Sequence, residues 1–83
     1  MPRYFFDIDD GDISTEDDEG LELEGPREAR NRAIAVLPGI AREVLPDGDR
    51  REFIVTVRDA KGQRLFLARL SFEAQWLIAP PAG

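Results

Sequence analysis

One stretch with helical periodicity separates two stretches that alternate as β-strands do, and this order restricts the fold more than any other feature of the sequence. In the helical stretch, apolar residues recur three and four positions apart: Ala29, Ala33, Val36, Leu37, Ile40, Ala41 and Val44. Such spacing places one apolar face on an amphipathic helix. That face must be buried against the flanking strands, which predicts a two-layer α+β domain.

The bounds of the helix follow from its prolines. Gly25-Pro26 opens it, because proline at the first helical position gives up only an N–H that would lack a helical partner. Pro38-Gly39 interrupts it, and proline in a helix interior costs about 3 kcal/mol. The apolar stripe nevertheless stays in phase across the interruption. We therefore predict one long helix, kinked at Pro38-Gly39 and ending before Pro46, with two short helices as the alternative.

The segment before the helix has the pattern of a hairpin. Residues 3–9 alternate apolar and polar side chains, which is typical of a strand. Asp10-Gly11 predicts a tight turn, because glycine accepts a positive φ, and residues 12–15 then form the short return strand. Residues 21–24 also alternate, which indicates an edge strand or an extended lead-in to the helix.

A second hairpin follows a turn at Pro46–Asp49. Residues 52–59 and 63–72 alternate as strands and are joined by a short turn. The two hairpins predict an antiparallel sheet of about four strands, in the order hairpin, helix, hairpin, with the helix on one face. For the core we expect Tyr4, Phe6, Ile8, Val36, Leu37, Ile40, Val44, Phe53, Val55, Val57, Phe66, Leu70 and Phe72.

One helix can cover only one face of such a sheet. The other face is therefore a candidate interface, with the apolar residues Phe5, Ile54, Leu65 and Leu67. With 83 residues there is room for one domain, which we assign to residues 1–78, followed by a flexible tail at 79–83. There is no apolar run of membrane-spanning length and no secretory leader, so we expect a cytoplasmic protein without membrane contact.

Acidic residues are concentrated near the start of the chain. Ten of the 17 lie between Asp7 and Glu24, and residues 4–26 contain no Lys or Arg. Residues 1–24 hold ten acids and one base, a net charge of −9, whereas residues 25–83 hold seven acids and ten bases, a net charge of +3. This polarity favours pairing of the arginines with the acidic segment, within one copy or head to tail between two copies. The net charge of −6 opposes direct binding to nucleic acid.

Several chemistries are excluded by residues that the sequence lacks. Without His or Cys there is no Ser-His-Asp or Cys-His nucleophile and no imidazole or thiolate zinc site. The Gly-x-Gly-x-x-Gly and phosphate-loop motifs are absent too. We therefore expect neither enzyme activity nor a cofactor.

The acidic segment also fails the pattern of a calcium loop, which needs Gly at position 6 and Glu at position 12. A loop beginning at Asp7 misplaces its glycine, and one beginning at Thr15 has Pro26 at position 12. We predict no metal site, and weak divalent binding by residues 17–19 is the alternative to a solvated turn. Residues 16–19 have no evident role in the fold, so Glu16, Asp17, Asp18 and Glu19 are candidate partner-binding residues. Trp76 in the C-terminal tail is a further candidate.

Several segments occur together in a distinctive order: Met1-Pro-Arg-Tyr-Phe-Phe-Asp-Ile8, the acid-glycine loop at residues 17–20, an Ala- and Arg-rich helix, and Phe53-Ile-Val-Thr-Val57. In this combination the chain resembles a small family of uncharacterised bacterial proteins of the rhizobial type. Its members are short stand-alone chains classed as a domain of unknown function. The resemblance covers nearly the whole chain and implies no known activity or catalytic residue.

Three functions are compatible with the sequence. The first is a non-catalytic protein-interaction module that self-associates, as a homodimer, through the open sheet face or the Trp76 tail. The second is an acidic inhibitor of a basic protein, since the order of elements also resembles antitoxins with a partial double-stranded-RNA-binding-like fold. The third is a weak divalent-cation-binding domain.

Overall fold

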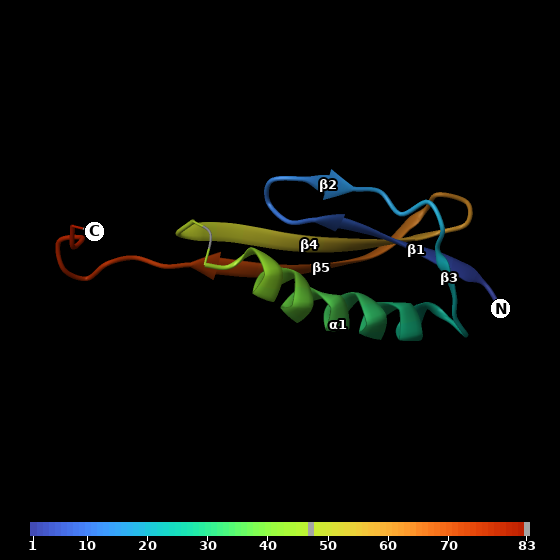
Figure 1. The fold of residues 1–83 in the computed structure, drawn as a ribbon. Helices are drawn as coiled ribbons and strands as arrows, with labels where there is room; N and C mark the ends of the chain where they lie inside the picture. The colour runs from blue at the N-terminus through green and yellow to red at the C-terminus, as the bar shows by residue number, and fades with distance from the viewer. Residues whose placement is uncertain (47, 83) are drawn as a thin grey trace.

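The computed structural model of the chain describes residues 1–46 and 48–82. It consists of one helix on one face of an antiparallel sheet of five strands, as Figure 1 shows. The elements in chain order are β1 (Arg3–Asp9), β2 (Ser14–Thr15), β3 (Leu21–Glu22), α1 (Pro26–Val44), β4 (Arg50–Asp59) and β5 (Arg64–Glu73). Asp47, in the predicted turn at residues 46–49, and Gly83, at the end of the predicted tail, lie outside the described residues.

The strand order in the sheet is β2-β1-β4-β5, and β3 pairs with β1 as well. Because β4 occupies one edge of β1, both short strands share the other: β2 pairs with Ile8 and Asp9, and β3 pairs with Arg3 and Tyr4. The sequence pattern of residues 21–24 was compatible with an edge strand or with an extended lead-in to the helix. In the structure β3 pairs with β1, so this segment includes an edge strand, which is the fifth strand of the sheet.

Both predicted hairpins are present. In the first, Gly11 has a φ of 94°, and the Asp10 carboxylate accepts the N–H groups of Asp12 and Ile13 at 2.9 and 2.8 Å. Side-chain acceptance of nearby backbone N–H groups explains why Asp is common in tight turns. In the second hairpin, β4 and β5 pair over nearly their whole length, with an irregularity in register beside Val57 and Arg58.

The prediction of a single helix is confirmed, and the alternative of two short helices is wrong. α1 begins at Pro26 and continues through Pro38 to Val44. Its buried residues Ala29, Ala33 and Leu37 face the sheet. Packing of this apolar face offsets the cost of the internal proline. No helix in residues 1–46 and 48–82 has the long apolar stretch that crossing a membrane requires.

The core lies between α1 and the sheet. Its buried residues are Tyr4, Leu23, Ala29, Ala33, Leu37, Phe53, Val55 and Val57. Two of the residues predicted for the core lie elsewhere: Leu70 is 38% exposed, and Phe72 is half-buried outside the cluster. Both belong to β5, which lies at the margin of the sheet and, among the described residues, has β4 as its one strand neighbour. Alternation correctly indicates the face on which these side chains lie, but it does not reveal that the strand is at the edge.

Candidate functional site

The acidic loop at residues 16–20 is tied to β1 by several hydrogen bonds, one of which uses the Asp17 carboxylate. Asp17 Oδ2 accepts the N–H of Phe6 at 3.0 Å, in the gap that β2 and β3 leave along the edge of β1. Asp17 Oδ1 accepts the N–H groups of Glu19 and Gly20 at 3.0 and 3.1 Å. Gly20 has a φ of 74°, and a Cβ there would lie 2.9 Å from a ring carbon of Phe5. The loop is therefore fixed by its acid and its glycine together.

Arg58 of β4 connects the same loop to the face of the sheet opposite α1. Its guanidinium donates to both carboxylate oxygens of Asp7, at 2.6 and 3.0 Å, and to the carbonyl oxygen of Asp17 at 2.9 Å. Asp7 in turn accepts the N–H of Asp17 at 3.0 Å. The guanidinium also lies 5.1 Å from the centre of the Phe5 ring, within the range of a cation–π contact.

These contacts shift three pKa values. The hydrogen bond with Arg58 lowers the pKa of Asp7 and raises the pKa of Arg58. Burial by itself would raise the pKa of Asp17, but the N–H groups of Phe6, Gly20 and Glu19 outweigh burial and lower it. Both aspartates therefore stay ionised at neutral pH and are occupied in holding the loop.

The structure separates the residues that the sequence grouped as partner-binding. The side chains of Glu16, Asp18 and Glu19 lie on the exposed surface of the loop, whereas Asp17 is half-buried. Trp76 is 59% exposed and belongs to the C-terminal tail. In Figure 1 this tail extends away from the sheet after β5. Within residues 1–46 and 48–82, no three acidic side chains are placed to hold a metal ion.

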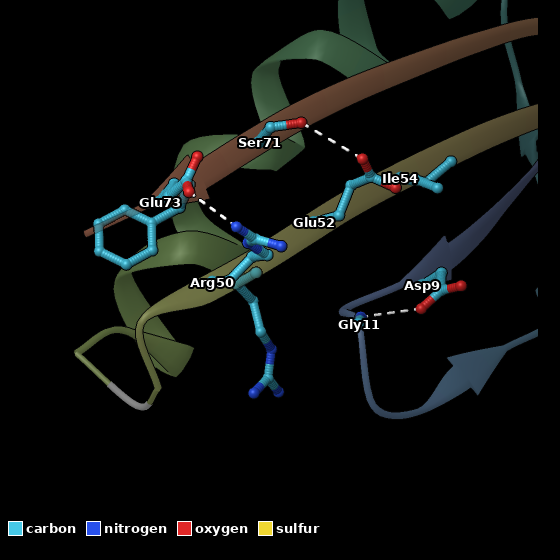
Figure 2. A pocket seen from close by; sticks show the side chains of 9 residues that line it. Asp9, Gly11, Arg50, Glu52, Ile54, Ser71 and Glu73 are labelled. Atoms are coloured by element: carbon cyan, nitrogen blue, oxygen red, sulfur yellow. Dashed lines mark hydrogen bonds and ion pairs between the residues drawn. The ribbon is translucent and has the colours of Figure 1, made fainter. Parts of the chain in front are cut away.

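The sheet face opposite α1 is more charged than its sequence pattern suggested. Of its predicted apolar residues, Phe5 lies against Arg58 and Ile54 is half-buried, while Leu67 is 42% exposed. Figure 2 shows a shallow hollow on this face, where Arg50 donates to Glu73 at 2.8 Å and Ser71 donates to Glu52 at 3.4 Å. Cross-strand pairs of this kind suit a solvated surface better than an apolar contact.

The outer edge of β5 is the largest unoccupied bonding surface on the sheet. Among the described residues, β5 pairs with β4 and with no other strand, so half of its backbone N–H and C=O groups point away from the sheet. Exposed apolar side chains accompany this edge: Leu67 and Leu70 on β5 itself and Ile34, 40% exposed, on α1. Ile34 lies one helical turn after Arg30, whose guanidinium is 6.0 Å from the ring centre of Phe66 on β5.

A second hollow opens between the start of α1 and the start of β5. Its lining residues are Pro26, Arg27, Arg30, Val57, Leu65 and Phe66. Apolar side chains therefore form its floor, and two arginines stand on its helix side. No sequence pattern indicates this hollow directly, because the hollow depends on the irregular register of β5 beside Val57 and on which strand is at the edge.

The chain was compared with known protein families, curated proteins and solved structures. A family model described as Domain of unknown function (DUF6894) matches residues 3–71, which include the helix and all but the last two residues of β5. No curated protein and no solved structure matches the chain.

Proposed function

This chain belongs to the family described as Domain of unknown function (DUF6894), and we propose that it is a small, non-catalytic protein-interaction module that self-associates through the outer edge of β5. The observation that carries the proposal is the unpaired edge of Arg64–Glu73, a strand of ten residues. Proteins usually protect such edges with charged residues, especially Lys, or with Pro, bulges or a covering segment. β5 contains neither Lys nor Pro, and its charged residues are Arg64, Arg69 and Glu73.

Apolar exposure supports the same surface. Leu70 and Ile34 lie beside the edge on the helix side and are 38% and 40% exposed. A strand added to β5 would cover Leu70 and satisfy the outward backbone groups at the same time. The sheet face opposite α1 is less suitable for self-association, because most of its apolar residues lie under or between charged ones.

Light scattering across a range of protein concentrations tests the proposal, and we expect a dimer at high concentration. Leu70→Lys should shift the protein to monomer, because an ammonium group at the edge disfavours strand pairing. Leu21→Lys is the matched control, since Leu21 is 39% exposed but lies on β3. A wild-type protein that stays monomeric at all concentrations would contradict the proposal.

A second function, an acidic inhibitor that binds a basic protein, is favoured by the fixed loop. Asp17 holds the loop in place while Glu16, Asp18 and Glu19 remain exposed to a partner. Replacing those three by Gln, Asn and Gln, with Asp17 intact, should abolish salt-sensitive capture of a basic protein from lysate. Capture of the same protein by the triple variant would contradict this function.

The third alternative is weak binding of a divalent cation. A melting temperature that does not change in millimolar calcium or magnesium would contradict this alternative.

A further inference from the structure

We propose that the partner is a second copy whose β5 pairs antiparallel with β5 about a two-fold axis at Leu70, and that each copy inserts Trp76 into the other's hollow at the start of α1. This arrangement rests on the proposed self-association and specifies its geometry. A two-fold axis through the sheet keeps both helices on the same side, because paired residues of antiparallel strands point to the same face.

Side-chain sizes on the helix side fit this register. Leu70 meets the partner's Leu70, and Ala68 meets the partner's Phe72. Phe66 then meets the partner's Ala74, which lies in line with the strand because its N–H donates to the Asp49 carbonyl at 2.7 Å. Each aromatic ring is therefore opposite a small side chain, which allows close packing across the axis.

Charges on the opposite side disfavour one neighbouring register. With the axis at Leu70, Arg69 lies opposite the partner's Ser71 and diagonal to both the partner's Glu73 and the partner's Arg69. With the axis at Arg69, two arginines would face each other directly, which is destabilising. An axis at Ala68 would place two small side chains at the centre and would leave Glu73 beyond the paired residues.

The register also accounts for the exposed tail. Trp76 follows Ala74 by two residues, so in an extended chain it points to the same face and reaches the partner's Arg64 end of β5. The hollow lined by Leu65, Phe66 and Arg30 is at that end. An indole there would bury apolar surface and lie near guanidinium groups, an arrangement that stabilises tryptophan at interfaces.

Cysteine cross-linking tests the axis, because the chain has no cysteine of its own. Leu70→Cys should form an intermolecular disulfide readily, since residue 70 meets its own copy. Ala68→Cys and Arg69→Cys are the matched controls and should cross-link about tenfold more slowly, because their α-carbons lie beyond bridging distance from their own copies. Fast cross-linking at 68 or 69 in place of 70 would overturn this register.

Trp76 is the only tryptophan, so its fluorescence reports its burial directly. Its emission should move to shorter wavelength as the concentration rises through the dimer transition. Trp76→Ala should raise the dimer dissociation constant at least about tenfold. Leu77→Ala is the control and should leave the constant unchanged, because Leu77 is 89% exposed and lies in a bend beyond the extended segment.

The results separate the two proposals. If the dimer dissociation constant is unchanged in Trp76→Ala, or if the tryptophan emission does not shift on dimerisation, this arrangement is wrong but self-association is not contradicted. A protein that is monomeric at every concentration overturns both.

Discussion

Asp17 accepts N–H groups from two parts of the chain with its two carboxylate oxygens. Phe6 of β1 donates to one oxygen, and Glu19 and Gly20 donate to the other. Charged acceptors strengthen such hydrogen bonds, and an unsatisfied N–H in a half-buried position is costly. The acidic character of the loop at this one position is therefore structural.

Replacing Asp17 by Asn should lower the free energy of unfolding by about 1–3 kcal/mol. An amide can accept the loop N–H groups with its oxygen, but its NH₂ group then faces the N–H of Phe6, donor against donor. Urea denaturation measures the loss. Asp18→Asn is the control, because Asp18 is exposed, and it should change stability by less than about 0.5 kcal/mol. Equal losses from the two variants would contradict the structural role of Asp17.

Asp7 and Asp17 should also make the protein sensitive to acid. Their pKa values are lowered in the folded state from an ordinary value of 3.8. Their stabilising contribution is therefore fully present above that ordinary value and is lost as the pH falls through the lowered values. Unfolding midpoints should stay level from pH 7 to about pH 5 and decline below about pH 4. Asp7→Asn should make that decline shallower, and an unchanged slope would count against the pair with Arg58.

The interpretation that residues 16–19 lack a role in the fold was wrong for Asp17. A run of four acids gives no hint of which one turns inward. The partner of Asp17 is the backbone of Phe6, 11 residues away, and the two meet only because β2 and β3 leave a gap along β1. That gap depends on the register of two strands of two residues each, which alternation cannot specify.

At the scale of elements, α1 tolerates two residues that disfavour helices. Pro38 and Gly39 lie within the helix, yet Leu37 beside them is 6% exposed and anchors the turn in the core. Tertiary burial therefore outweighs local propensity here. The phase of the apolar stripe was enough to predict this outcome, because the stripe extends over both sides of the interruption.

Gly39→Ala should stabilise the protein by about 1 kcal/mol, because alanine loses less backbone freedom than glycine when a helix forms. A Cβ at Gly39 meets no atom within 4 Å, and its φ is not positive. Gly20→Ala is the contrasting variant and should destabilise, because its Cβ would clash with Phe5 at a positive φ. Thermal melts of both variants check the pair of predictions, and a loss of stability in Gly39→Ala would contradict the first.

Other elements were predictable to different degrees. The hairpins and the helix followed from alternation and periodicity, which depend on neighbours along the chain. Strand order could not be predicted in this way. The exposure of Leu70, the hollow beside Leu65 and the free edge of β5 all depend on strand order, so they could not be predicted either. Trp76 was predicted as a contact residue of the C-terminal tail. Its proposed relation to the hollow needed the strand order and the register of β5.

For the whole molecule, the charge polarity is neutralised in part within one copy. Arg3 pairs with Glu22 at 3.1 Å, Arg58 with Asp7 at 2.6 Å, and Arg51 with Asp10 at 3.9 Å. These contacts agree with the first of the two pairings that the sequence allowed. Between two copies, the net charges of −6 repel each other.

Salt therefore distinguishes edge pairing from head-to-tail attraction. Raising the ionic strength from about 50 to 500 mM should strengthen or preserve the dimer formed through β5, because screening reduces the repulsion between like net charges. Head-to-tail pairing between the acidic and basic parts should weaken over the same range. Sedimentation equilibrium at both ionic strengths measures the difference, and a dimer that dissociates in salt would contradict edge pairing.

The way β2 and β3 divide one edge of β1 has a consequence for how far an assembly can grow. Each of these short strands pairs with β1 through two residues, and the N–H of Phe6, between the two pairings, donates to the Asp17 carboxylate. Once two copies have joined through β5, the outermost strands are these short ones, which present too few bonding groups to recruit another chain. In the proposed dimer, addition would therefore stop at two copies, and the sheet would not propagate into a fibre.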